Sequence, residues 1–199
     1  MRRCVDIIVA LIALAALSPI LIVIVLAVFI SSPGSPFYGG RRAGKDGRHF
    51  RMWKFRTMVD GAAKLGPITG KNDPRVTPLG RILRKTKLDE LPQFFNLLLG
   101  HMTLVGPRPE SPEIVALYTP SQRVVLAVKP GVTGRVQLDS EDESETMPEG
   151  VEAYDYYLTH LMDRKLRMDL DYLRRRTVFT DAKIVLATAG LMFRASARR

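Results

Sequence analysis

The chain has 199 residues and a formal net charge of +10. This length excludes two large domains, and a composition close to that of average globular proteins excludes wholesale disorder. The positive charge is concentrated in residues 41–56 and 75–87, and such a surface suits nucleic acid, anionic lipid or phosphorylated ligands. Cys4 is the only cysteine, so no intramolecular disulfide can form, which fits a reducing compartment.

The N-terminal segment is an apolar run long enough to span a bilayer. Residues 7–30 are apolar except for Ser18 and Pro19 at the midpoint. Proline lacks an amide hydrogen and its ring clashes with the carbonyl four residues earlier, here that of Ala15, so we expect a kink. The Ser18 hydroxyl is well placed to satisfy the freed backbone group in lipid. The run is longer than the apolar core of a cleaved signal peptide and lacks its cleavage site.

Both flanks of this run are basic, with Arg2 and Arg3 before it and Arg41, Arg42 and Lys45 after it. Positive residues favour the cytoplasmic side of a membrane. Each limb of the run covers about 16 Å at 1.5 Å per residue, roughly half of the hydrocarbon thickness. A re-entrant helix that turns at the Ser–Pro break satisfies both flanks. A straight span with a tolerated proline stays open as the alternative.

The first half of the remaining chain predicts a loop, a strand and two helices. Residues 31–40 are rich in Gly, Ser and Pro, which is typical of a tight exit loop. Aromatic and basic residues alternate over 49–58, which predicts a short strand or strand-like loop. Thr77 and Pro78 predict the N-cap and first position of a basic helix that runs to residue 85. A second helix is expected over 88–99, ended by Gly100.

The second half predicts a strand over 102–105, followed by the rigid Gly-Pro-Arg-Pro turn of residues 106–109. Helices are expected over 121–129, 150–161 and 181–193. Residues 139–152 hold seven acids and no base, which predicts a mobile surface loop. The fold class is therefore α/β, mostly helical with short strands.

Several familiar kinds of site are absent from the sequence. There is no Gly-rich dinucleotide fingerprint and no phosphate-binding loop of the GxxxxGK[ST] type. The three histidines are isolated, and with one cysteine there is no zinc-binding pattern.

A carboxylate pair and several arginines remain as candidates for chemistry. Asp89 and Glu90 are adjacent in the first turn of an expected helix, where partial positive charge favours carboxylates and bound phosphate. Acidic residues are also common there for stability alone. Arg84, Arg108 and Arg56 could converge on the same helix end and bind a pyrophosphate. Arg108 lies between two prolines that restrict the backbone, so we expect its planar guanidinium to be oriented in advance.

These residues resemble those of the bacterial sugar transferases, or small monotopic phosphoglycosyl transferases, which begin the assembly of lipid-linked glycans. The most specific matching block is LGRILRKTKLDELPQFFNLLLGHMTLVGPRPE, residues 79–110. The Ser–Pro break and KFRTM (54–58) also match, and KPGVTGRVQL (129–138) and TDAKIVLAT (180–188) match more loosely. These pieces follow the family order across nearly the whole chain.

The resemblance implies a mechanism and roles for individual residues. Asp89 is expected to be the nucleophile that attacks the sugar-linked phosphate of a UDP-sugar and expels UMP, and Glu90 its partner. Both are expected to hold Mg²⁺, and Arg56, Arg84, Arg108 and Gln137 to bind substrate phosphate. Polyprenyl (undecaprenyl) phosphate would then take the phosphosugar from the enzyme.

The resemblance also implies an organisation and a location. Residues 1–36 would form a re-entrant membrane helix and its exit loop, and residues 37–199 a catalytic domain with interfacial amphipathic helices. This domain would lie on the cytoplasmic face of a bacterial inner membrane, with membrane lipids and downstream glycosyltransferases as partners and no nucleic acid. The chain departs from the family after Gln137, where acids replace a short polar Gly-Arg segment. If the family's arginine in this segment contacts substrate, that contact is missing here or another base replaces it.

Two other functions fit parts of the sequence. A membrane-anchored protein without enzymatic activity could use the basic face to bind anionic lipid or nucleic acid, but would not need the acidic pair. A phosphohydrolase could use the same aspartyl intermediate with water as the acceptor.

Overall fold

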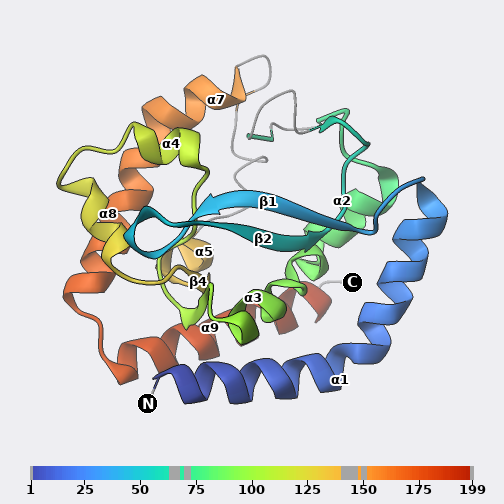
Figure 1. Cartoon of the computed structure of the whole chain (residues 1–199), viewed down its shortest axis with the longest axis horizontal. Helices are drawn as coiled ribbons and strands as arrows, with labels where there is room; N and C mark the ends of the chain where they lie inside the picture. Colours follow the sequence, from blue (N-terminus) through green and yellow to red (C-terminus); the bar gives the residue numbers. More distant parts are fainter. Residues whose placement is uncertain (1, 63–67, 70–72, 140–147, 149–151, 198–199) are drawn as a thin grey trace.

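The computed structural model describes residues 2–62, 68–69, 73–139, 148 and 152–197. Helices surround a long β-hairpin, and a second, very short sheet lies between this hairpin and the C-terminal helices (Figure 1). The expectation of a mostly helical fold with short strands is confirmed. Most of the acidic 139–152 segment, and with it the expected surface loop, lies outside the described residues.

The N-terminal helix α1 (Arg2–Ser31) contains Pro19 and changes direction about midway along its length (Figure 1). The Ser18 hydroxyl donates a hydrogen bond of 2.8 Å to the carbonyl of Ala15, the group that proline leaves without a partner. Among the described residues, α1 is the one helix that is long and apolar enough to cross a membrane. Most of its apolar side chains are exposed, as a membrane-anchoring helix requires.

Strands β1 (Phe37–Ala43) and β2 (His49–Phe55) form the antiparallel hairpin, with Phe37 opposite Phe55 and Ala43 opposite His49. The strand expected within residues 49–58 is confirmed. The prediction of an exit loop over 31–40 is wrong for its last four residues, which belong to β1. The Phe37 ring stacks on Phe55, with ring centroids 5.5 Å apart, and this pairing draws the segment into the sheet.

Helix α2 (Pro78–Lys85) begins as expected, because the Thr77 hydroxyl accepts a hydrogen bond of 2.9 Å from the Gly80 amide. The helix packs closely on the segment that follows β2. A Cβ added at Gly80 would lie only 2.0 Å from the carbonyl oxygen of Thr57, so only glycine fits there. This close contact fixes the start of α2 next to the segment that follows the hairpin.

The prediction of a single helix over 88–99 is wrong in its first turn. Residues Leu88–Glu90 form the 3₁₀ turn η3, and the α-helix α3 covers Gln93–Leu99. Pro92 cannot donate an i→i−4 bond, and the preceding amide of Leu91 bonds Leu88 with the tighter 3₁₀ spacing. Gly100, with φ of 81°, ends α3 as expected.

The second sheet pairs β3 (Thr103–Val105) in parallel with β4 (Gly131–Thr133). The strand expected over 102–105 is confirmed, whereas β4 was not anticipated. The Pro-Arg-Pro turn after β3 is tied to β4, because the Gly131 amide donates to the carbonyl of Pro107 at 2.9 Å. Packing of the two segments is so close that a Cβ on Gly131 would lie 2.1 Å from the Gly106 nitrogen.

Apart from β4, the elements described in the C-terminal half are helical. It comprises α4 (Pro112–Ala116), the 3₁₀ helix η4 (Gln122–Ala127), α5 (Arg135–Asp139), α7 (Ala153–Tyr156), the π-helical turn η5 (Tyr157–Leu161), α8 (Met162–Arg174) and α9 (Val178–Ala197). Helical structure within 121–129 and 181–193 is confirmed, as is the described part of 150–161. Helix α8 was not anticipated. Its Leu166 joins the largest core cluster, with Ile114, Tyr118, Val125 and Tyr157.

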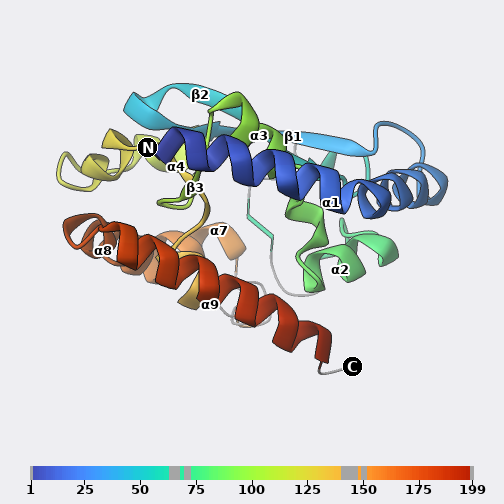
Figure 2. The same ribbon diagram turned by 90° about the horizontal axis from the view of Figure 1, so that it is seen from below.

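Both ends of α1 are attached to the same domain. Near its start, the Arg3 guanidinium donates to the carbonyls of Leu97 and Leu98 at the end of α3, each at 2.6 Å. The buried Asp6 carboxylate accepts bonds from the Thr103 hydroxyl and the Leu104 amide. Beyond its other end, the Arg56 guanidinium binds the carbonyls of residues 32 and 33. The first limb of α1 and helix α9 run along one side of the molecule (Figure 2).

Candidate functional site

The centre of the candidate site is the carboxylate pair of η3. Lys87, with φ of 57°, breaks the chain between α2 and η3 and turns the pair back toward the hairpin. Asp89 is buried, with 6% of its surface exposed, whereas the Glu90 side chain is 23% exposed. In a 3₁₀ turn, neighbouring side chains point about 120° apart. The two carboxylates therefore have different surroundings.

Two bases hold Glu90. The Lys54 ammonium, from β2, lies 2.6 Å from Glu90 Oε1 and donates a hydrogen bond to it. A guanidinium nitrogen of Arg108 lies 3.5 Å from the same oxygen. Burial opposes ionisation, but Lys54 and Arg108 outweigh it and hold the pKa of Glu90 well below its usual range. Glu90 is thus an anion at neutral pH.

Asp89 is affected in the opposite direction. Burial raises the pKa of the Asp89 carboxyl, and the negative charge of Glu90 adds to this effect, while Lys54 and Arg84 oppose it. Among the described residues, no hydrogen bond is made to the Asp89 carboxylate. A buried carboxylate with this environment is poorly solvated, which suits the nucleophile role expected of Asp89.

Arg84 reaches the pair from α2. Its Nε donates a hydrogen bond of 2.9 Å to the Thr57 hydroxyl, and its charge lowers the pKa of Asp89. The structure places Arg84 and Arg108 near the acidic pair, as the sequence predicted, whereas their role in phosphate binding stays a prediction. Together with Lys54 and Lys87, whose charges also act on the pair, they surround it with four positive charges, a suitable environment for a pyrophosphate.

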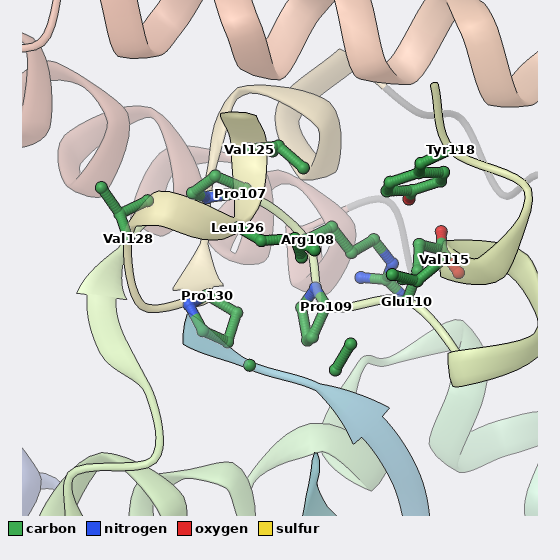
Figure 3. A pocket seen from close by; sticks show the side chains of 12 residues that line it. Pro107, Arg108, Pro109, Glu110, Val115, Tyr118, Val125, Leu126, Val128 and Pro130 are labelled. Atoms are coloured by element: carbon green, nitrogen blue, oxygen red, sulfur yellow. The ribbon is translucent and has the colours of Figure 1, made fainter. Parts of the chain in front are cut away.

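Arg108 is held by the turn after β3. Figure 3 shows its side chain leaving the turn between Pro107 and Pro109 and running toward the side where Glu110 and Tyr118 lie. Its backbone amide donates a hydrogen bond of 3.2 Å to Oδ2 of Asp169, on α8. The Arg108 side chain is one third exposed, with 33% of its surface accessible, so a ligand can reach it.

Among the described residues, neither Arg56 nor Gln137 contacts the acidic pair. The Arg56 guanidinium is engaged with the carbonyls of Ser32 and Pro33 at the end of α1. Gln137 lies on α5, and its Oε1 is buried without a hydrogen-bond partner among the described residues. Their expected role in phosphate binding stays a prediction.

Asp89 and Glu90 fit a Mg²⁺ ion only if the substrate supplies part of the ligands. Mg²⁺ is commonly held by one or two carboxylates together with waters and substrate phosphates. Asp89 and Glu90 supply two carboxylates, while no group of three or more His, Cys, Asp or Glu side chains suited to a metal occurs in the described part of the chain. The donor set suits an ion that arrives with a diphosphate rather than one held by protein ligands alone.

Lys54 and Asp169 were not singled out in the sequence. Lys54 precedes Phe55 in the KFRTM segment, and only its contact with Glu90, 36 residues away, gives it a role. Asp169 lies on α8, which was not anticipated. The sequence signal for α8 was the apolar spacing of Met162, Leu166, Leu170 and Leu173, which suits one face of a helix.

Comparison with known proteins identifies the family of the chain. The profile of the bacterial sugar transferase family matches residues 1–195. The chain is 38% identical over 196 residues to the UDP-glucose:undecaprenyl-phosphate glucose-1-phosphate transferase of Escherichia coli (strain K12), covering 94% of this chain and 39% of that protein. It is 33% identical to the undecaprenyl-phosphate galactose phosphotransferase of Salmonella typhimurium, covering 98% of this chain and 40% of that protein.

A shorter relative is matched over most of its length. The exopolysaccharide production protein ExoY of Rhizobium meliloti is 34% identical over 203 residues, which cover 94% of this chain and 83% of ExoY. The chain therefore belongs to the bacterial sugar transferase family. It spans about 39% of the length of the E. coli relative.

Proposed function

We propose that this protein is a phosphoglycosyl transferase that moves a phosphosugar from a UDP-sugar to polyprenyl (undecaprenyl) phosphate and releases UMP. One observation carries the proposal: the buried Asp89 lies beside Glu90 within a cluster of four bases, in a family whose named relatives transfer sugar phosphates to undecaprenyl phosphate. The reaction would begin the assembly of a polysaccharide or another glycoconjugate.

The transfer proceeds in two displacements at phosphorus. The Asp89 carboxylate attacks the sugar-bearing β-phosphorus, and the bond between this phosphorus and the bridging oxygen breaks, so UMP leaves with the electron pair. An oxygen of polyprenyl phosphate then attacks the aspartyl-phosphosugar, which forms polyprenyl-diphosphosugar and frees Asp89. Covalent catalysis divides one difficult displacement into two easier ones.

The basic residues have separate tasks in this scheme. Arg84 and Arg108 bind the diphosphate and offset the charge that develops on UMP. Lys54 keeps Glu90 ionised and oriented. Bound Mg²⁺ would supply Lewis-acid stabilisation of the diphosphate, with Asp89 and Glu90 as its protein ligands.

A re-entrant arrangement of α1, with the catalytic domain on the cytoplasmic face of the inner membrane, completes the proposal. It is supported by the attachments at both ends of the helix. Arg3 and Asp6 bind α3 and β3, while Arg56 binds the chain just beyond the other end of α1. A helix that crossed the bilayer would have its ends on opposite sides, where one compact domain could not bind both. The site would then lie near the interface, where the lipid phosphate is found.

The function is tested by incubating the purified full chain with UDP-glucose, UDP-galactose or UDP-N-acetylglucosamine, with and without undecaprenyl phosphate. We expect UMP release and a lipid-linked diphosphosugar with at least one donor. Free sugar phosphate in the absence of lipid would instead indicate a phosphohydrolase. If no donor yields UMP, the proposed function is wrong and the non-enzymatic lipid-binding alternative gains support.

A further inference from the structure

The peptide group between Pro107 and Arg108 is held from two sides. Its carbonyl oxygen, which belongs to Pro107, accepts a hydrogen bond of 2.9 Å from the Gly131 amide of β4. Its N–H, which belongs to Arg108, donates a hydrogen bond of 3.2 Å to Oδ2 of Asp169 on α8. A trans peptide group is planar and its C=O and N–H point in opposite directions, so these two bonds fix the orientation of the plane.

The two prolines leave only this plane to be fixed. The ring of Pro107 locks its own φ, and Pro109 restricts Arg108, the residue before it, to extended backbone conformations. The rotations that stay free are ψ of Pro107 and φ of Arg108, which lie on either side of the shared peptide plane. The bonds from Gly131 and to Asp169 therefore settle the direction in which the Arg108 side chain leaves the turn (Figure 3).

Asp169 is the side chain that reaches this turn from α8. Neither proline carries an N–H, so the Arg108 amide is the only backbone donor of residues 107–109, and Asp169 accepts it. Asp169 is buried, with 4% of its surface exposed, and its other oxygen, Oδ1, has no hydrogen-bond partner among the described residues. Burial raises the pKa of Asp169 to about 7, and the bond from the Arg108 amide opposes this shift. Such a carboxyl does not favour folding, which points to a role other than stability.

The cavity beside Asp169 is too small for a substrate. Its volume is about 20 Å³, which accommodates one water molecule. Glu110 and Tyr118 line it together with Arg108 and Asp169. A water molecule in this cavity can donate a hydrogen bond to Oδ1 and so solvate the buried carboxyl. Asp169 can therefore affect a substrate only through Arg108.

The other end of Arg108 lies at the acidic pair. A guanidinium nitrogen is 3.5 Å from Glu90 Oε1, and the side chain is exposed enough to meet a bound diphosphate as well. A planar guanidinium binds two phosphate oxygens only in the right orientation. Rotation of the peptide plane held by Asp169 would move this planar group, and a misplacement of about 1 Å can lower a rate by roughly a hundredfold.

From these contacts we infer that Asp169 is a positioning residue, which holds the Arg108 amide and so directs the guanidinium at the diphosphate of the donor. The inference rests on the proposed function and adds to it the residue that sets the geometry of one phosphate-binding side chain. A different side chain that accepts the same amide can take the place of Asp169. A side chain without an acceptor cannot.

The test compares variants at position 169 with and without an acceptor. Asp169→Leu has none, and it should lower kcat/KM for UMP release roughly ten- to a hundredfold and weaken inhibition by UDP. Asp169→Asn keeps an oxygen for the Arg108 amide, while its NH₂ group can donate to a water in the cavity. It should therefore lose less activity than Asp169→Leu. The matched control is Asp171→Leu on the same helix, whose side chain is 63% exposed and which should keep wild-type kinetics.

A double-mutant cycle with Arg108→Ala separates positioning from a general loss of structure. Arg108→Ala has no guanidinium to direct, so adding Asp169→Leu should lower kcat/KM no further, whereas independent effects multiply. A loss of folded protein would instead reduce activity by the same factor in both backgrounds, and the melting temperatures of all four proteins check the fold. If leucine does not pack at this position, Asp169→Ala removes the same acceptor without added bulk and enters the same cycle.

Three results overturn the inference. The first is that the losses from Asp169→Leu and Arg108→Ala multiply independently. The second is that Asp169→Asn is impaired as much as Asp169→Leu, which would mean that the reaction needs the carboxylate charge and not the bond to the amide. The third is that Asp169→Leu has wild-type kinetics. A wild-type enzyme that releases UMP but gives one of these results contradicts only the role of Asp169, whereas a wild type without UMP release contradicts the proposed function as well.

Discussion

Lys54 Nζ and Glu90 Oε1 lie 2.6 Å apart, which joins the second strand of the hairpin to the η3 turn that carries the acidic pair. Their side chains are 21% and 23% exposed, so the contact is shielded from most of the solvent. The buried Asn96 side chain of α3 also fixes the position of β2. It accepts a hydrogen bond of 2.9 Å from the Trp53 amide and donates one of 2.7 Å to the Arg51 carbonyl. The hairpin is thus the support that holds one half of the acidic pair.

Replacing Lys54 by methionine should lower kcat/KM roughly ten- to a hundredfold, the effect of losing a hydrogen bond worth about 1.5–3 kcal/mol to a charged group. In wild type, Lys54 and Arg108 hold the pKa of Glu90 low, so Glu90 becomes protonated only far below neutral pH. Without Lys54, this pKa rises, and activity should fall at a higher pH on acidification. The pH profile of kcat/KM measures the change, with Lys45→Met in the hairpin turn as the control. An unshifted acid limb would show that Lys54 does not keep Glu90 ionised.

Replacing Arg108 by lysine separates a substrate contact from a structural one. Lysine keeps the charge but loses the planar fork that binds two phosphate oxygens. We expect kcat/KM to fall roughly ten- to a hundredfold, or about 1.4–2.7 kcal/mol. The melting temperature should barely change, because the 3.5 Å contact with Glu90 is long and partly exposed and contributes about 0–1 kcal/mol. A variant that melts several degrees lower with normal turnover would mean that Arg108 only stabilises the turn.

Asp169 should make the stability of the protein depend on pH. Burial raises the pKa of this carboxyl to about 7, above the value of about 3.9 in an unfolded chain. The folded state therefore binds an extra proton between these values, and stability falls as the pH rises through this range. Asp169→Asn removes the cost of the charge and should melt at a higher temperature than wild type at pH 8, by at least 2–4 °C for about 1 kcal/mol. Near pH 4 the difference should vanish, and an equal difference at both pH values would contradict the assignment.

The topology of α1 is tested by labelling single cysteines in a Cys4→Ala background. A cysteine at position 3 and one at position 42 should both react from the cytoplasmic side of the membrane. Replacing Ser18 and Pro19 with Ala and Leu should straighten the helix and shift part of the population to a full span. A periplasmic residue 3 in the protein with an intact Ser–Pro break would contradict the re-entrant arrangement.

Local chemistry explains which parts of the fold the sequence could predict. The Thr77 cap, the Gly100 terminator and the Ser18 bond to Ala15 each depend on residues within a few positions, and all three are confirmed. Strand β4 has only three residues and exists because Gly131 approaches Gly106 closely. Its pairing depends on a tertiary contact that no local pattern contains.

The candidate site, like the fold, has parts that the sequence predicts and parts that only the tertiary structure shows. Asp89, Glu90, Arg84 and Arg108 belong to one continuous block of sequence, and the structure brings them together. Lys54 joins them from 36 residues away, and Asp169 lies 61 residues beyond Arg108. Arg56, in the same segment as Lys54, instead binds carbonyls near the end of α1. Lys54 and Arg56, two positions apart at the end of one strand, thus contact the acidic pair and the end of α1 respectively, and the sequence alone does not separate these contacts.

The proposed covalent intermediate is tested most directly by the fate of the β-phosphate. With a UDP-sugar labelled at this phosphate and no lipid acceptor, wild-type protein should retain label in an acid-stable precipitate, and added undecaprenyl phosphate should transfer it to lipid. Asp89→Asn should retain no label, keep its fold and lose nearly all turnover, because the loss of a nucleophile raises the barrier by several kcal/mol, about 1.36 for each tenfold in rate. Turnover of Asp89→Asn within about tenfold of wild type, or label that remains on this variant, would contradict Asp89 as the nucleophile.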